Sequence, residues 1–329
     1  MHRRAFLTGL VAISGAAPVW AAMDDVDPAV SSIKPALRVL LGRGQASMLG
    51  PGEFLFNGRH YRGSFSLLPN GDVVNLVDIE SYLYSVVTRE MPPSWPISAL
   101  QAQAIAARTY VLARSNPQRA YDVVPSEIDQ VYSGIESETE SGRAAVSATA
   151  GDVLQLDGHF ASIAYSSCCG GHTENAGDAW GGRAPVNLRG VVCGYCTDSP
   201  WYRWTRTLRL ADLAVAFAAE LQGEAIIGFA ASDIDRSGRA RAFSLQTERG
   251  VRSIPATRAR ARIGTRVLPS LLVHSISPPQ ADGTVVIEGG GLGHGVGLCQ
   301  WGARGLARTN ASALAILSWY FPGTTTAHE

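Results

Sequence analysis

The chain has 329 residues, of which 46% are hydrophobic and 17% are charged, with 28 basic and 28 acidic side chains. This length and apolar content are enough to bury a core in one large or two medium domains, which excludes wholesale disorder. The formal net charge of zero argues against a nucleic-acid-binding polyelectrolyte, so we expect no nucleic-acid partner. After the N-terminus no apolar run approaches the length of a membrane span.

The first 21 residues have the pattern of a secretory signal. Arg3 and Arg4 precede a short, mildly apolar stretch, and Val19 and Ala21 suit positions −3 and −1 of a signal-peptidase site. The paired arginines favour the twin-arginine route, so we expect an exported protein of the periplasm or cell envelope. An uncleaved membrane anchor is the alternative, which the shortness of the apolar stretch argues against.

Residues 22–35 are typical of a linker, and short β-rich runs follow from 37 to 77. Among them, Asn70-Gly71 predicts a hairpin turn. Asp78 is then a candidate N-cap for a helix that Pro92 and Pro93 end. An alanine-rich second helix is predicted over 97–114.

The remaining elements predict an α+β fold. Residues 145–166 are predicted to be strands, 211–221 a weaker helix, and 311–320 a terminal helix capped by Asn310. We expect a mixed β-sheet core with a few packed helices and an inserted smaller subdomain. Its parts are a first section of the core at 36–205, an inserted α/β subdomain at 206–282, and a C-terminal section of the core at 283–329.

Glu90 comes just after the predicted end of the first helix. A carboxylate there faces the negative end of the helix dipole, and Met91 and Trp95 supply apolar surroundings, so its pKa should be raised. A raised pKa suits a general acid near neutral pH. A solvated loop glutamate is the alternative.

In the second helix, Gln101 and Arg108 lie seven positions apart and so share one face. Small alanine side chains around them would let a ligand or another chain segment approach closely. The alternative is a close-packed helix in which Arg108 pairs with a structural acid.

The five cysteines are clustered in an unusual way. Cys169 with His172, and Cys193 with Cys196, form two ligand pairs that each enclose two residues, the spacing of a structural Cys3His zinc site. In an oxidising compartment, disulfides among Cys168, Cys169, Cys193 and Cys196 are the competing interpretation. Cys299 stands alone.

A glycine-rich loop over 289–297 presents His294, and Gln300 follows it. The loop lacks the Gly-Lys-Ser/Thr of a phosphate-binding loop. Cys299 beside Gln300 could also suggest a cysteine peptidase, which we reject because no peptidase signature is present.

Taken together, four blocks resemble the SpoIID/LytB family, named for stage II sporulation protein D and the amidase enhancers. They occur in family order over residues 76–323. The blocks are Tyr82 to Pro92 with Trp95 to Tyr110; Asp129 to Gly134; Ala164 to Thr173; and Gly293 to Ala303 with Tyr320 to Gly323.

The resemblance implies a peptidoglycan lytic transglycosylase that acts on glycan strands, with strands that have lost their stem peptides as the expected substrate. Glu90 matches the family's catalytic glutamate. Arg108 matches an active-site arginine that would position the strand, and Gln101 stands where the family commonly has lysine. Leu292 likewise replaces a frequent tryptophan.

The same four blocks contain Tyr165, His294 and Gln300, and we expect these three side chains to contact substrate together with Gln101 and Arg108. Cys169, His172, Cys193 and Cys196 resemble a metal-ligand set found in part of the family, with zinc in a structural role. A non-catalytic glycan-binding modulator of a cell-wall amidase is the second functional hypothesis, and an amidase is then the expected protein partner.

Overall fold

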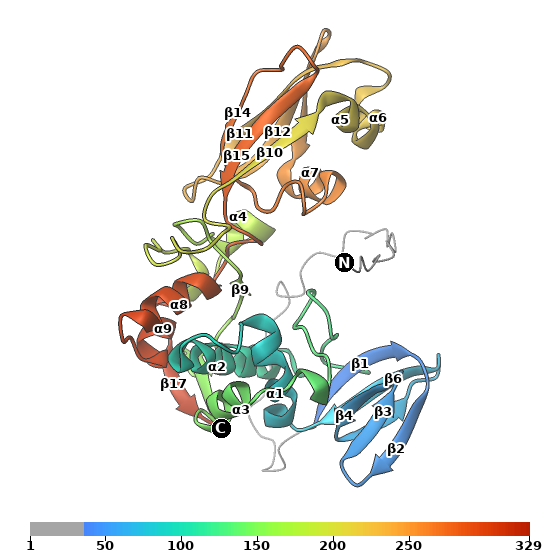
Figure 1. The fold of residues 1–329 in the computed structure, drawn as a ribbon, viewed down its shortest axis with the longest axis vertical. Helices are drawn as coiled ribbons and strands as arrows, with labels where there is room; N and C mark the ends of the chain where they lie inside the picture. The colour runs from blue at the N-terminus through green and yellow to red at the C-terminus, as the bar shows by residue number, and fades with distance from the viewer. Residues whose placement is uncertain (1–35) are drawn as a thin grey trace, which may run out of the picture.

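The computed structural model describes residues 36–329, so the expected signal segment and linker lie outside the described residues. The described chain contains both helices and strands, largely in separate runs, which confirms the α+β class. The strands of residues 36–329 form six small sheets rather than one large sheet. Buried apolar side chains gather in two separate clusters, which correspond to the lower and upper parts of Figure 1.

Two three-stranded antiparallel sheets form the N-terminal part, drawn in blue in Figure 1. One has the order β1-β6-β5 and the other the order β2-β3-β4. Gly71 takes a positive φ of 85° in the turn between β5 and β6, which confirms the predicted hairpin. The strands are β1 (Leu37–Arg43), β2 (Ala46–Gly50), β3 (Glu53–Phe56), β4 (Arg59–Arg62), β5 (Ser64–Leu67) and β6 (Asp72–Val77).

Three helices follow and form the centre of the first cluster. In α1 (Ile79–Glu90), the predicted N-cap is confirmed because the side chain of Asp78 accepts a hydrogen bond from the backbone N–H of Ser81 at 2.9 Å. The second helix, α2 (Ile97–Arg114), has the predicted bounds, and its small alanines are buried against its neighbours. A short 3₁₀ turn, η2 (Ile135–Ser137), leads to α3 (Glu140–Ser147).

The prediction of strands throughout 145–166 is correct only in part, because it fails at the N-terminal end and between three short strands. Residues 145–147 belong to α3, because the side chain of Thr139 caps that helix by accepting from Gly142 N–H at 3.1 Å. Regular strands occur only at β7 (Asp152–Leu156), β8 (His159–Phe160) and β9 (Tyr165–Ser166). Short helical segments then follow at α4 (Ala176–Trp180) and η3 (Val186–Leu188).

The C-terminal section returns to the first cluster. β16 (Leu298–Cys299) pairs in parallel with β9, and β17 (Thr325–His328) pairs with β7. Between them, α8 (Gln300–Arg308) and α9 (Ala313–Tyr320) contact α2. The predicted cap Asn310 is wrong: Ser312 caps α9, and Asn310 occupies a left-handed turn with a φ of 62°.

The second cluster is formed by the chain between about 204 and 290. One sheet has the order β10-β15-β14, the other β11-β12-β13, and three helices accompany them. The predicted helix at 211–221 is broken at Phe217 into α5 and α6. The elements are β10 (Trp204–Arg209), α5 (Leu210–Ala216), α6 (Ala218–Leu221), β11 (Ile226–Ile234), β12 (Ala240–Thr247), β13 (Gly250–Pro255), α7 (Ala256–Ile263), β14 (Leu272–Ile276) and β15 (Thr284–Gly290).

The chain enters and leaves this second unit at neighbouring points, since Trp204 of β10 is paired with Gly289 of β15. We propose that the unit is the inserted subdomain expected at 206–282, extended at each end by these two paired strands. Among residues 36–329, no helix is both long enough and apolar enough to cross a membrane.

We predict that a cavity made by substitution in one hydrophobic cluster lowers the stability of that cluster and not of the other. Phe243 is fully buried in the second unit, where its ring stacks on Phe229 at a centroid distance of 5.0 Å. Phe243→Ala should lower the stability of this unit by about 3–5 kcal/mol. Hydrogen exchange should accelerate in β11–β13 and not in α2.

Phe54→Ala is the matched control, because Phe54 is equally buried in the first cluster. It should leave exchange in β11–β13 unchanged. Equal acceleration of both regions by either variant would show that the chain unfolds as one unit and would contradict the proposed subdomain.

Candidate functional site

Glu90 is the last residue of α1, whereas the sequence predicts that it comes just after the helix end. The helix is fixed by its cap at Asp78 and by a buried face that includes Val86 and Val87. Met91 has an extended backbone, and the prolines that follow cannot continue the helix, so the chain turns away at this point. The carboxyl of Glu90 is therefore held at a defined helix end.

Both carboxylate oxygens of Glu90 accept a hydrogen bond. The backbone N–H of Val131 donates to Oε1 at 3.0 Å, and the side-chain Nε2 of Gln300 donates to Oε2 at 3.3 Å. Burial raises the pKa of Glu90 above its ordinary value, and it outweighs the lowering by these two hydrogen bonds. The direction is the one that the sequence predicts.

Gln300 connects Glu90 to a second glutamine that the sequence did not single out. Nε2 of Gln300 also lies 3.5 Å from Oε1 of Gln103, which is fully buried in α2. Nε2 of Gln103 has no hydrogen-bond partner within the described part of the chain. A buried amide without a partner is costly, so this N–H pair marks a place where a polar group would be stabilised.

Gln101 and Gln103 do not share a face of α2, because residues two apart on a helix point in different directions. Gln101 is partly exposed, whereas Gln103 is buried. The signal that could have found Gln103 was its place in the same Gln-Ala-Gln stretch, two residues after Gln101.

The structure places Arg108 away from Glu90. Its Nε and Nη2 donate to the two carboxylate oxygens of Glu80 at 2.8 and 2.6 Å, and Nη1 donates to the carbonyl of Asp152 at 2.9 Å. Glu80 and Glu90 are at opposite ends of α1, about 15 Å apart at 1.5 Å per residue. The side chain of Arg108 is 2% exposed. These contacts favour the structural ion pair that the sequence left open, and the expected role of Arg108 in strand binding stays a prediction.

Tyr165 lies near Glu90. The hydroxyl of Tyr165 is buried without a partner among residues 36–329. Its pKa is raised well above the ordinary value, first by burial and then by the negative charge of Glu90. The strand pairing of Tyr165 with Leu298 brings this side chain next to the segment that leads into Gln300.

His294 occupies the glycine-rich loop with its ring half-buried. Its Nδ1 accepts a hydrogen bond from the backbone N–H of Val296 at 3.0 Å, and its ring lies 5.2 Å from that of Trp180. Burial lowers the pKa of His294 to about 4, so the imidazole is neutral near pH 7. His294 is therefore suited to a neutral hydrogen bond and not to balancing the charge of Glu90.

Four buried thiols come together beside this site. The Sγ atoms of Cys169, Cys193, Cys196 and Cys299 all lie within 4.8 Å of one another, and these cysteines are not joined by disulfides. Four sulfurs bound to one zinc at about 2.3 Å would be about 3.8 Å apart in a tetrahedron. The 3.7 Å between Sγ of Cys169 and Sγ of Cys196 agrees with that spacing. Such a group could hold a metal ion.

The donors around the thiols also suit metal-bound thiolates. Sγ of Cys299 accepts from the backbone N–H groups of Cys169 and Gly302 at 3.2 and 3.4 Å, and the hydroxyl of Tyr320 lies 3.0 Å from Sγ of Cys193. Hydrogen bonds of this kind orient the ligands of a metal site and stabilise negative charge on sulfur.

His172 is not part of this group, so the predicted ligand set is corrected. Its Nδ1 lies 2.6 Å from the carbonyl oxygen of Thr173, and Cys299 supplies the fourth ligand atom instead. The sequence left Cys299 aside because it is distant along the chain. The parallel pairing of β16 with β9 brings it to the other cysteines.

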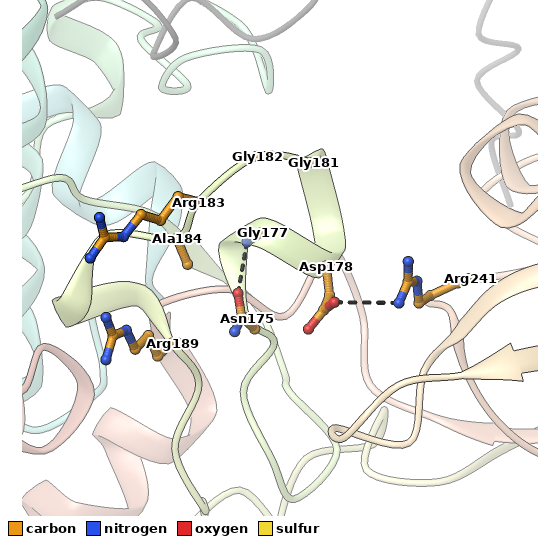
Figure 2. A pocket seen from close by; sticks show the side chains of 9 residues that line it. All are labelled: Asn175, Gly177, Asp178, Gly181, Gly182, Arg183, Ala184, Arg189 and Arg241. Atoms are coloured by element: carbon orange, nitrogen blue, oxygen red, sulfur yellow. Dashed lines mark hydrogen bonds and ion pairs between the residues drawn. The ribbon is translucent and has the colours of Figure 1, made fainter.

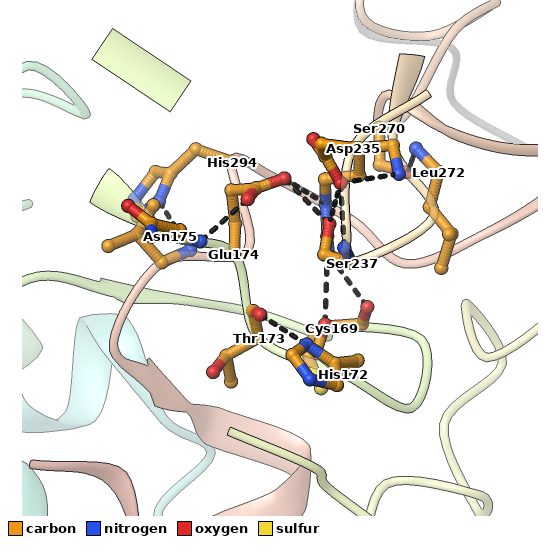
Figure 3. A network of polar contacts seen from close by, with 12 residues as sticks. Cys169, His172, Thr173, Glu174, Asn175, Asp235, Ser237, Ser270, Leu272 and His294 are labelled. Carbon is orange, nitrogen blue, oxygen red and sulfur yellow. Dashed lines mark hydrogen bonds and ion pairs between the residues drawn. The ribbon is translucent and has the colours of Figure 1, made fainter. Parts of the chain in front are cut away.

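A buried polar network joins the second unit to the loop that carries Cys169 (Figure 3). Arg239 is 2% exposed and donates to the carbonyls of His172 and Cys169 at 3.0 and 2.7 Å. Ser237 donates to Oε2 of Glu174 at 2.7 Å, and Arg239 Nε lies 3.8 Å from the same oxygen. Burial raises the pKa of Glu174 to about 7. The sequence gave no signal for this network, whose members are far apart along the chain.

Comparison with known proteins identifies relatives of this chain. The family model described as stage II sporulation protein (SpoIID) matches residues 70–156, the part that holds Glu90 and α2. An uncharacterised protein of Brachyspira hyodysenteriae is 34% identical over 82% of this chain and 73% of its own length.

Two further relatives have names that concern sporulation or an amidase. Stage II sporulation protein D of Bacillus amyloliquefaciens is 28% identical over 76% of this chain and 74% of its own length. The amidase enhancer of Bacillus subtilis is 28% identical over 74% of this chain, but the match spans only 40% of that longer protein.

We predict that Arg108 acts on stability. Arg108→Met should lower the free energy of unfolding by about 3 kcal/mol, because it leaves the carboxylate of Glu80 without its partner. Urea denaturation measures the change, and binding of the folded variant to insoluble glycan should match that of the wild type.

Arg114→Met is the control on the same helix. Arg114 is 44% exposed and its Nε lies 3.5 Å from Asp129, so its loss should cost about 1 kcal/mol or less. A stable Arg108→Met variant that fails to bind glycan would instead support the strand-binding role.

Proposed function

The chain belongs to the stage II sporulation protein (SpoIID) family, and from this premise we propose that it is a peptidoglycan lytic transglycosylase with Glu90 as its general acid and base. Family membership gives it a role in the cell wall. The cleavage of glycan strands, with strands free of stem peptides as the preferred substrate, is our proposal.

The observation that carries the proposal is the state of the Glu90 carboxyl. It is partly buried, its pKa is raised, and each oxygen is within hydrogen-bonding distance of a donor. A carboxyl with a raised pKa keeps its proton to a higher pH than an ordinary glutamate does and can donate it to a leaving group. The donors from Val131 and Gln300 then stabilise the carboxylate that remains.

The proposed reaction needs only this one carboxyl. Glu90 gives its proton to the glycosidic oxygen as the bond from that oxygen to C1 of the muramic acid breaks. The resulting carboxylate takes the proton of the C6 hydroxyl of the same sugar while O6 forms a bond to C1. The product ends in a 1,6-anhydro ring, Glu90 regains its proton, and no water or second carboxylate is consumed, unlike the usual glycosidase pair.

We assign supporting roles to the groups around Glu90. Gln300 positions the carboxyl of Glu90 by a hydrogen bond, and Gln103 of α2 positions the amide of Gln300 in turn. The hydroxyl of Tyr165 and the neutral ring of His294 remain proposed substrate contacts, as does the partly exposed Gln101. Arg108 is proposed to fix α1 against α2 and not to touch the strand.

A non-catalytic modulator of a cell-wall amidase is the second candidate. It is favoured by the similarity to the amidase enhancer, and by Gln101 at a position where the resemblance leads one to expect lysine. Under this hypothesis Glu90 would bind glycan without transferring a proton, and an amidase would be the partner.

We also propose that the chain is exported to the periplasm or cell envelope and that its cysteine group holds one structural zinc ion. Cys169, Cys193, Cys196 and Cys299 would be the ligands. Zinc bound in this way contributes its binding free energy to folding and takes no part in the proton transfers.

The central prediction concerns Glu90→Gln. The amide keeps the size of the side chain but has no proton to donate, so strand cleavage should fall by about 10²–10⁴-fold while glycan binding persists. Mass spectrometry of digested glycan strands should show 1,6-anhydro ends for the wild type. The pKa of Glu90 is raised and the protonated form is the active one. Wild-type activity should therefore fall at a higher pH than it would if Glu90 had the ordinary pKa of a glutamate.

Glu127→Gln is the control, since it removes an exposed carboxyl whose charge acts on Glu90 without a direct contact. It should retain activity. Reducing ends in the products would indicate hydrolysis, and cleavage by Glu90→Gln at the wild-type rate would make the amidase modulator the better hypothesis.

For the metal, we expect about one zinc per chain in protein purified without chelator. Cys299→Ala should lose zinc and unfold at a lower temperature, because three ligands remain and the binding free energy falls. His172→Ala should keep its zinc, since Nδ1 of His172 faces a carbonyl. Two disulfides among the four cysteines, detected without reduction, would exclude the site.

A further inference from the structure

A polar cavity lies between the two units, away from the groups assigned above (Figure 2). Its volume is about 450 Å³. The segment around α4 and η3 forms one wall with Arg183 and Arg189, and Arg241 of β12 forms the other. A volume of this size is within the range of small-molecule sites and can hold a sugar ring with its substituents.

The cavity carries an excess of positive charge. Its one carboxylate belongs to Asp178, which lies 3.7 Å from Nη1 of Arg241. Arg241 is also 3.5 Å from Asp233. Neither Arg183 nor Arg189 has a carboxylate oxygen within 4 Å anywhere in residues 36–329. Two guanidinium groups are therefore free to bind an anion, whereas the third is already balanced.

The wall that carries these two arginines is firmly held. The side chain of Asn175 caps α4 by accepting from Gly177 N–H at 2.7 Å. Asn187 is buried in η3 and donates through Nδ2 to the carbonyl of Ser162 at 2.7 Å. Leu188 is buried beside it in the first cluster. These contacts hold the backbone before Gly181 and immediately before Arg189, while the side chains of Arg183 and Arg189 are exposed to solvent and accessible to a ligand.

The same wall is connected to the groups around Glu90. Trp180 ends α4, is 37% exposed, and packs on His294 in the glycine-rich loop that leads to Gln300. Ser162, which accepts from Asn187, lies on the segment that leads to Tyr165. A glycan strand bound along these segments would contact both the cavity and the surroundings of Glu90.

We propose that this cavity is a subsite for a carboxylate of the glycan strand, bound by Arg183 and Arg189. The inference rests on the proposed function, which supplies a polymer whose muramic acid residues carry a lactyl carboxyl. The planar guanidinium group matches a carboxylate with two parallel hydrogen bonds, and such charge-assisted bonds are stronger than neutral ones. A free lactyl carboxylate and the carboxylates of a stem peptide share this chemistry.

The test measures binding without turnover, in the full chain that carries Glu90→Gln. The probes are a muramic-acid-containing tetrasaccharide with free lactyl carboxylates, the same compound with those carboxyls reduced to alcohols, and a peptide-bearing tetrasaccharide. Arg183→Ala with Arg189→Ala should weaken binding of the free-carboxylate probe by about 10-fold or more. Binding of the reduced probe should not change, because it offers no anion.

Two controls separate this effect from charge and folding. Arg59→Ala with Arg119→Ala removes the same charge from exposed positions outside the cavity and should leave binding unchanged. Arg241→Ala should have a smaller effect than the double variant, since Arg241 already has carboxylate partners. Thermal unfolding should show that each variant is folded.

An equal loss with the reduced and the free-carboxylate probes, or no loss with either, would overturn the subsite. A loss confined to the peptide-bearing probe would keep the carboxylate site and assign its ligand to the stem peptide. Wild-type protein that forms no anhydro ends, combined with arginine-dependent binding in Glu90→Gln, would refute the transglycosylase and leave the subsite standing.

Discussion

Four buried thiols are the constraint on which the arrangement of the rest depends. Cys169 follows β9, Cys193 and Cys196 lie in an irregular segment, and Cys299 ends β16 immediately before α8. Irregular segments lack the ladders of hydrogen bonds that hold helices and strands together. Three distant stretches of the chain meet at these thiols. A metal ion bound by the four sulfur atoms, or a disulfide between two of them, would hold the stretches together at this point.

The consequences of this junction extend in two directions. On one side, Cys299 caps α8, and the first residue of that helix is Gln300, whose amide reaches Glu90. On the other side, the carbonyl of Cys169 accepts a hydrogen bond from Arg239, which belongs to the second unit. Any displacement of the thiols would therefore move both the support of the Glu90 carboxyl and the contact between the units.

Burial has a cost in both places. Glu90 and Glu174 have raised pKa values because burial disfavours their charged forms. For Glu174, the donors Ser237 and Arg239 offset part of this cost and hold the units together. For Glu90, burial creates the proton donor that the proposed reaction needs. Burial thus accompanies the contact between the units at Glu174, and at Glu90 it would serve the proposed reaction.

Local patterns were sufficient for the elements whose signals are contained in a few neighbouring residues. The cap at Asp78, the bounds of α2 and the turn at Gly71 follow from side-chain capping, helix-forming alanines and the positive φ of glycine. The direction of the Glu90 pKa was also predictable from its place at a helix end beside apolar residues. The prediction failed where a short apolar run is compatible with either a helix or a strand, as at 145–147 in α3.

The partners across the chain were decided only by tertiary structure. Spacing suggested His172 as a ligand, but strand pairing brings Cys299 to the thiols instead. Helical periodicity put Arg108 beside Gln101, but the packing of α1 on α2 gives its guanidinium to Glu80. Arg239 and Glu174 gave no local signal, and Gln103 was marked only by its place two residues after Gln101. The sequence by itself determined the cap and course of α1, the bounds of α2, the turn at Gly71 and the direction of the Glu90 pKa, because those properties depend on near neighbours. Which side chains meet depends on contacts between residues far apart along the chain, and these exist only in the folded molecule.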